Sequence, residues 1–377
     1  MAITDRSQTS GPPSRNRRGE RREPKVKTQP RPRGSLGQLG RYSGVLILFA
    51  FIAIFAIWIP DTFLTSTTLK TILSTQAITG VLALAVVFPL AAGSFDLSAA
   101  QNTGLSALIV GALMARAPHL SPVIAIAITL AVALTIGIGN GILVAVIGMN
   151  SFIATLGTSS LLLSLDELIA NGNYVGPFPR SFTSITDHSP LGIPIVAIYL
   201  FVLAVVGWYV LEHTPVGRRT YGAGANPDAA RLAGVRTSRY VFGSLAVCSV
   251  LAGAAGILLA SSINSADQSL GPGYLLPAYA GAFLGTTQIK PGRFNIWGTM
   301  LAIYLLGTGI EGLQLAGAQL WVTDMFNGVA LIGAVSFALV LQRHRSEKPA
   351  DAVPARERRP SKAADTGSEG GGARDPG

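Results

Sequence analysis

Long apolar stretches alternate with short polar connections over most of this chain of 377 residues. The stretches consist mainly of hydrophobic residues, and the connections are rich in Gly, Pro and polar side chains. A helix needs about 20 apolar residues to cross the hydrocarbon layer of a bilayer, and several stretches are shorter. The pattern predicts an all-α membrane protein with about ten transmembrane helices, some of them broken or re-entrant. The predicted spans are 43–59, 72–92, 97–115, 122–147, 151–170, 191–211, 239–262, 274–289, 296–316 and 321–341.

The two ends of the chain differ in composition from the spans. Residues 1–42 are rich in Arg, Pro, Gly and Ser, and residues 342–377 mix basic and acidic side chains with a run of Gly. Such segments cannot bury enough apolar surface to fold. We therefore expect a disordered tail at each end of one transmembrane domain, 43–341, whose longest polar loop is 212–239.

The distribution of charge predicts how the chain crosses the membrane. The net charge is +10, yet only 13% of the residues are charged and the mean hydropathy is +0.46. Of 29 Lys and Arg residues, 26 fall in the two tails, the loop 212–239 and the connection 290–293. Basic residues gather on the cytoplasmic side of membrane proteins. We expect both termini and the loop 212–239 in the cytoplasm, and no nucleic-acid partner; the basic tails can also attract anionic membrane lipid.

Small residues and a short sequence similarity predict how the spans pack. Closely spaced glycines such as Gly253 and Gly256 allow membrane helices to approach one another. Residues 153–160 are similar to 281–288, and in the predicted topology the two segments run in opposite directions. Inverted repeats are common in transporters, so the similarity points to one here.

The loop 212–239 is predicted to contain a short helix over 227–233. Asn226 can cap its free amides, Pro227 suits the first helical position, and Gly234 can close the far end. Two turns of helix are not stable alone, so this helix must lean on its own domain or on another protein. We interpret it as a docking site, with candidate residues Asn226, Pro227, Asp228, Ala229, Ala230, Arg231, Leu232 and Gly234.

Charged and amide side chains at membrane depth are costly and therefore informative. Asp96 lies in a polar break between two spans, 93–98, where it can cap the following helix or line a translocation pathway. Glu311 interrupts a later span, and a water-filled cavity would accommodate its charge. The candidate pathway residues are Asp96, Ser98, Gln101, Asn102, Glu311 and Gln314.

Other polar residues lie nearer the predicted ends of the spans. Asp166 and Glu167 fall near the outer end of the fifth span, either as interfacial charges or as a docking site for an external protein. Asp324 and Asn327 fall near the start of the last span, where the membrane interface can satisfy them.

The sequence lacks the patterns that catalysis or metal binding would require. No lysine follows a glycine, so there is no phosphate-binding P-loop. The four His residues and the single Cys248 show no metal-ligand spacing. A membrane enzyme acting on lipid-linked substrates would need a carboxylate pair, but adjacent residues such as Asp166 and Glu167 point about 100° apart on a helix. We expect no enzyme activity, no metal and no cofactor in this chain.

Three motifs resemble those of the permease subunits of bacterial ATP-binding-cassette importers for ribose, xylose and arabinose. Gly93-Ser-Phe-Asp-Leu-Ser98 is similar to that family's Gly-Gly-Ile-Asp-Leu-Ser. Asn140-Gly-Ile-Leu followed by Phe152-Ile-Ala-Thr-Leu-Gly-Thr158 is similar to a second motif, and the segment 217–234 is similar to the family's cytoplasmic coupling segment. The resemblance covers about 42–341.

The chain departs from the family pattern at two of these places. Ser94 and Phe95 stand where the family has Gly and Ile, and Glu311-Gly-Leu-Gln314 stands where the family has a stretch like Asn-Gly-Leu-Asn. These changes fall on candidate pathway residues, so the usual pentose is not implied.

The resemblance implies a permease of the bacterial inner membrane and a set of partners. The permease would pair with a second copy or a close homologue, and an extracytoplasmic solute-binding protein would deliver a monosaccharide or similar small polar solute. ATPase subunits, which bind and hydrolyse the ATP, would dock on the coupling helix 226–234.

Other functions are also compatible with the sequence. A proton-coupled secondary transporter would carry protons through Asp96 or Glu311. An ATP-driven permease could alternatively carry a nucleoside, a branched-chain amino acid or a quorum-signalling sugar derivative.

Overall fold

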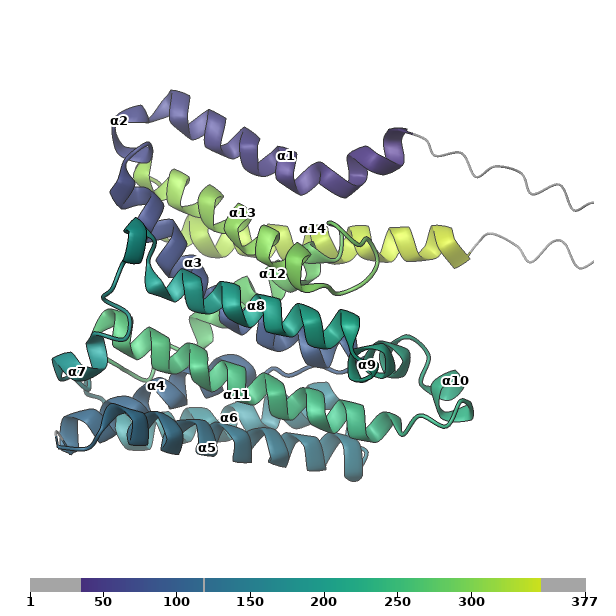
Figure 1. Ribbon diagram of the computed structural model, residues 1–377, viewed down its shortest axis with the longest axis horizontal. Helices are drawn as coiled ribbons and strands as arrows, with labels where there is room; N and C mark the ends of the chain where they lie inside the picture. Colours follow the sequence, from purple (N-terminus) through teal and green to yellow (C-terminus); the bar gives the residue numbers. More distant parts are fainter. Residues whose placement is uncertain (1–34, 118, 347–377) are drawn as a thin grey trace, which may run out of the picture.

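The computed structural model describes residues 35–117 and 119–346, and the side chains within 44–336 (Figure 1). The described chain is helical, and its one β-bridge joins Val175 to Ala266. The prediction of an all-α fold is confirmed. The helices are α1 (Ser35–Trp58), α2 (Pro60–Phe63), α3 (Ser66–Ala91), α4 (Ala99–Arg116), α5 (Pro122–Gly141), η1 (Ile142–Val146), α6 (Ser151–Ala170), α7 (Arg180–Thr183), η2 (Pro190–Gly192), α8 (Ile195–His213), α9 (Pro215–Ala225), α10 (Pro227–Leu232), α11 (Thr237–Ile263), η3 (Pro272–Tyr274), α12 (Leu275–Gly285), α13 (Ile296–Leu315) and α14 (Trp321–Ser346).

Each predicted span overlaps one of these helices. The matching helices are α1, α3, α4, α5, α6, α8, α11, α12, α13 and α14. Within the described residues, six of them are long and apolar enough to cross a membrane by length and composition. These are α3, α5 with η1, α6, α8, α11 and α13. α12 has only 11 residues, which is too short to span the hydrocarbon layer, as expected for a broken segment.

The described ends of the chain lie at the same end of the molecule. The beginning of α1 and the end of α14 are on the side of α10, and α7 is on the opposite side (Figure 1). This arrangement agrees with an even number of spans. α1 begins at Ser35, inside the predicted tail 1–42, and α14 continues beyond 341 to Ser346. The remaining parts of both predicted tails lie outside the described residues.

α3 and α11 form the centre of the bundle. Every residue from Ala77 to Ala92 is buried, as expected of a helix that is apolar on all faces. α11 packs against α3, α4 and α5, and Gly256 of α11 lies so close to Thr103 of α4 that a side chain there would clash with the Thr103 carbonyl. The small residues thus permit the close approach that their spacing predicted.

The helix contacts reveal an internal repeat. α11 packs on α4 and α5, and correspondingly α3 packs on α12 and α13; α4 contacts α6 as α12 contacts α14. α3 ends beside α9, whereas α11 begins beside α10, so the two sets run in opposite directions. The repeat relates α4 to α12, whereas the similar segment 153–160 falls on α6 and 281–288 covers the end of α12 and the residues after it. That sequence match therefore joins positions that are not equivalent, although an inverted repeat exists.

Candidate functional site

The predicted docking helix is present as α10, Pro227–Leu232. The Asn226 side chain accepts a hydrogen bond from the Ala229 amide at 3.0 Å, and Pro227 occupies the first turn. This is the capping arrangement that the sequence predicted. The helix ends one residue earlier than expected.

Gly234 closes α10 in the left-handed conformation. Its φ is +79°, which side chains other than Gly rarely adopt. The Val235 amide donates to the Ala230 carbonyl at 2.9 Å, and the Gly234 amide donates to the Arg231 carbonyl at 2.9 Å. These two bonds form a Schellman motif, so both ends of this short helix are fixed by local interactions.

α10 packs on the rest of the protein through its one buried residue and exposes the others. Ala230 is buried, and the helix contacts α9 and α11. Leu232 is 92% exposed, and the ion pair between Asp228 and Arg231, at 3.5 Å, is also on the surface. An almost fully exposed leucine next to this ion pair, on a helix fixed at both ends, is suited to insertion into another protein.

The sequence did not reveal α9, the helix that carries α10. Thr214 accepts a hydrogen bond from the Gly217 amide at 3.3 Å, and Pro215 follows it in the first turn. The same cap and proline signal marks α10, so the start of α9 could have been found. Three glycines within 11 residues concealed the helix, because Gly disfavours helix interiors.

α9 is fastened on two sides. At Gly224 its backbone lies against the end of α3, where an added side chain would meet the Ala91 carbonyl and the Gly93 amide. On the other side the Tyr221 hydroxyl donates to the Phe294 carbonyl at 2.6 Å, and the Arg293 guanidinium lies 3.5 Å from the centre of the Tyr221 ring. Burial raises the pKa of the Tyr221 phenol, so it stays protonated and keeps donating at neutral pH.

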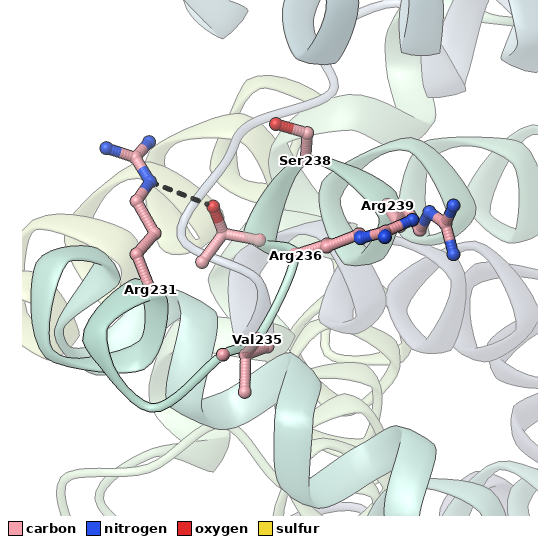
Figure 2. Close-up of a pocket in the computed structure, with 7 residues that line it drawn as sticks. Arg231, Val235, Arg236, Ser238 and Arg239 are labelled. Atoms are coloured by element: carbon pink, nitrogen blue, oxygen red, sulfur yellow. Dashed lines mark hydrogen bonds between the residues drawn. The ribbon is translucent and has the colours of Figure 1, made fainter.

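A shallow hollow beside α10 is lined by basic side chains. Arg231, Arg236 and Arg239 contribute to it, together with the first turn of α11. The Arg231 Nε donates to the Thr237 hydroxyl at 3.2 Å, a bond that Figure 2 draws as a dashed line from Arg231. The exposed face of α10 therefore continues into a positively charged surface.

The helix break 93–98 connects α3 to α4, and its polar residues Ser94, Asp96 and Ser98 are buried, whereas Gly93 and Phe95 are exposed. The Asp96 side chain is fully buried, and its Oδ1 accepts from the Ser98 amide at 3.1 Å and from the Ser98 hydroxyl at 2.6 Å. Asn140 of α5 donates to the Ser98 hydroxyl at 2.8 Å. Asp96 therefore closes the turn before α4, and the N-cap position itself is Ser98.

The backbone of the break is satisfied by side chains from two other helices. The amide of Phe95 donates to Ser151, and the amide of Leu97 donates to Thr155, each at 3.0 Å. The Asp96 amide donates to the hydroxyl of Tyr279, on α12, at 3.1 Å. Buried amides without such partners would be costly, so the break is held by α6 and α12 together.

The structure separates the candidate pathway residues into two groups. The first group is buried between helices: besides Asp96 and Ser98, Gln101 donates to Asp166, and Asn102 donates to the Ser249 carbonyl at 3.0 Å. The second group lines a cavity of about 190 Å³ between α3, α13, α14 and η3. Its predicted members are Glu311 and Gln314.

The interpretation of Asp166 as an interfacial charge is wrong. Asp166 is fully buried and faces Gln101, whereas its neighbour Glu167 is exposed. Successive residues on a helix point about 100° apart, so one carboxylate faces α4 and the other faces outward. Asn327 differs from expectation in the same way: it is 1% exposed and lines the cavity. Among the described residues, no group of three His, Cys, Asp or Glu side chains could hold a metal.

Comparison with known proteins agrees with the sequence motifs. A protein-family profile described as "Branched-chain amino acid transport system / permease component" matches residues 68–335. The ribose import permease protein RbsC of Bacillus subtilis (strain 168) is 30% identical over 315 residues, which cover 83% of this chain and 95% of that protein. The autoinducer 2 import system permease protein LsrD of Yersinia enterocolitica is 30% identical over 272 residues, which cover 70% of this chain and 82% of that protein.

No solved structure matches the chain. The family profile covers most of the sequence, and the related proteins are permeases of import systems. Together with the apolar helices, these matches confirm the resemblance to importer permeases that three motifs suggested. The chain is a multi-pass membrane protein and belongs to this family of transport-system permease components.

Proposed function

We propose that this permease is the membrane subunit of an ATP-binding-cassette importer for a monosaccharide or similar small polar solute. The observation that carries the proposal is α10, a short helix fixed at both ends that presents Leu232 and an ion pair to the surface. Such a rigid projection suits a groove on a partner. The related permeases are named for import of ribose and of autoinducer 2, which favours a sugar-like cargo.

ATPase subunits are the proposed partners of α10, and they would bind and hydrolyse the ATP. α9 provides the connection from α10 to the membrane helices, because Gly224 touches the end of α3 and Tyr221 is bonded to the segment before α13. Movement of α10 would therefore displace the helix break and α13 together. ATP binding drives a change in the permease if the ATP-bound partner binds one of two permease conformations more tightly than the other.

The orientation and the remaining partners follow from the same proposal. α10 and both termini would face the cytoplasm, in agreement with the asymmetry of basic residues. An extracytoplasmic solute-binding protein would then meet the opposite end, near α7. A second copy or homologue would cover part of the apolar outer surface, where residues such as Leu161 and Phe201 are exposed.

A proton-coupled secondary transporter is the competing function, and the position of Glu311 supports it. Glu311 is half-buried at the cavity, where a carboxylate can exchange protons with water. Measurement of solute uptake by vesicles that contain the permease distinguishes the ATP-driven importer from the proton-coupled transporter. We expect uptake of a monosaccharide, tested with D-ribose, D-xylose and L-arabinose, only with ATP, the ATPase and the binding protein. Uptake by the permease alone under a pH gradient would establish the secondary transporter instead.

A further inference from the structure

The cavity between α3, α13, α14 and η3 has two chemically different walls. Hydrogen-bonding side chains come from three helices, namely Gln76 and Thr79 on α3, Glu311 on α13 and Asn327 on α14. Aliphatic side chains, including Leu306, form another part of its surface. The volume of about 190 Å³ is below the roughly 300–1,000 Å³ of pockets for drug-sized ligands. The cavity therefore suits a small amphiphilic solute.

Asn327 lines the cavity and carries an acceptor that no described residue uses. Its side chain is 1% exposed, and its Oδ1 has no hydrogen-bond partner among the described residues. Buried polar atoms are nearly always paired, and an unpaired one calls for a specific explanation. A solute hydroxyl that donates to this oxygen would satisfy it.

The charged residues that line the cavity favour a neutral solute. Among the described lining residues, Glu311 is the one charged side chain, and none is Lys, Arg or His. An amino acid could pair its ammonium group with Glu311, but its carboxylate would have no cation among these lining residues to pair with, which is unfavourable. A neutral polyhydroxylated solute avoids this cost, because its hydroxyls can donate to Glu311 and Asn327 and accept from the amide of Gln76.

We propose that this cavity is a weak binding site for a neutral monosaccharide on its way through the permease. The inference rests on the proposed function and adds the location and the chemistry of recognition. Hydroxyls of the sugar bind the oxygens of Asn327 and Glu311, and its C–H surface packs against aliphatic residues such as Leu306. Polar groups arranged around an apolar wall are the usual composition of small-molecule sites.

Protection of a cysteine tests the site on the permease alone. Cys248 is the single, buried cysteine, so Cys248→Ala gives a background in which Thr323→Cys places one thiol on the cavity wall. D-ribose should slow modification of this thiol by methyl methanethiosulfonate several-fold, and L-leucine should not. Met325→Cys is the matched control, since Met325 is on the same helix but outside the cavity and 52% exposed; its modification should not respond to either solute.

Two further variants keep the test decisive. Asn327→Leu, added to the Thr323→Cys protein, should abolish protection by D-ribose. Thr75→Cys, which also lines the cavity, replaces Thr323→Cys if that protein does not fold. Protection by L-leucine but not D-ribose would overturn the assignment to sugars.

The outcome for the site is distinguishable from that for the proposed function. If the reconstituted transporter imports D-ribose with ATP but neither cavity cysteine is protected, the site is wrong and the proposed function stands. If ATP drives no import of D-ribose, D-xylose or L-arabinose, the proposed function fails for this class of sugars, and protection by D-ribose would then indicate binding without transport.

Discussion

Gly224 of α9 lies directly against Gly93, the first residue of the helix break. A Cβ atom added to Gly93 would lie 3.0 Å from the Gly224 Cα, and one added to Gly224 would lie 2.8 Å from the Gly93 amide nitrogen. Real Cβ atoms do not approach backbone atoms this closely without displacing them. The segment that carries α10 is therefore in backbone contact with the segment that joins α3 to α4.

Replacing Gly224 with Ala should weaken the coupling between ATP hydrolysis and transport. The added methyl group would push α9 away from α3, so movement of α10 would reach the helix break less effectively. We expect ATP-driven uptake to fall several-fold while binding of the ATPase is retained. Gly222→Ala is the matched control, because in the described structure nothing lies within 4 Å of a Cβ added there. Equal uptake by the two variants would contradict the proposed connection.

The left-handed conformation of Gly234 predicts which substitutions α10 tolerates. Gly234→Val would strain the Schellman motif, because a side chain in this region costs about 1–2 kcal/mol and a β-branched one is especially unfavourable. Gly234→Asn should be tolerated, since Asn adopts this conformation more readily. We expect the Val variant to co-purify with less ATPase than the Asn variant. If both bind it as well as the wild type does, the geometry of α10 is not important for docking.

The buried carboxylate of Asp166 should contribute to stability, unlike its exposed neighbour. Asp166→Ala removes the partner of the buried Gln101 amide, and an unpaired buried donor costs about 1–3 kcal/mol. Thermal unfolding in detergent should show a lower midpoint for Asp166→Ala and no change for Glu167→Ala. The opposite order would mean that the hydrogen bond to Gln101 does not offset the cost of burying the Asp166 carboxylate, whose Oδ1 has no partner among the described residues.

The cavity predicts a difference between two buried threonines. Thr79 lines the cavity and Thr308 does not, and each is 5% exposed. Replacing either with Val removes a hydroxyl at nearly constant size. One lost hydrogen bond of about 0.5–1.5 kcal/mol should raise the solute concentration for half-maximal uptake by about twofold to tenfold in Thr79→Val. Thr308→Val should leave this concentration unchanged; a similar shift in both would point to a general packing effect.

The sequence alone predicts those elements of the fold that depend on signals within a short segment of the chain. The spans follow from apolar length, and α10 follows from Asn226, Pro227 and Gly234, whose roles are set by neighbouring backbone groups. α9 was missed because its glycines lower helix propensity, and their purpose becomes visible only when Gly224 is seen against Gly93. Local pattern does not reveal such contacts between distant segments.

The cavity could not be predicted, because its polar residues are far apart in the chain. Glu311 drew attention as a charge within a span, but Gln76 and Asn327 are single amides in apolar surroundings and join it only through packing of α3, α13 and α14. The burial of Asp166 could not be predicted for the same reason. Its sequence position placed it near a helix end, and only the position of α4 shows that its side chain is buried.

Docking of an ATPase on α10 is the central claim, and co-purification with Leu232→Asp tests it most directly. Leu191→Asp is the matched control, because Leu191 is also fully exposed but lies between α7 and α8, away from α10. We predict that the ATPase co-purifies with the wild type and with Leu191→Asp but is lost from Leu232→Asp, while all three proteins stay folded. Retention of the ATPase by Leu232→Asp at the wild-type level would contradict the account.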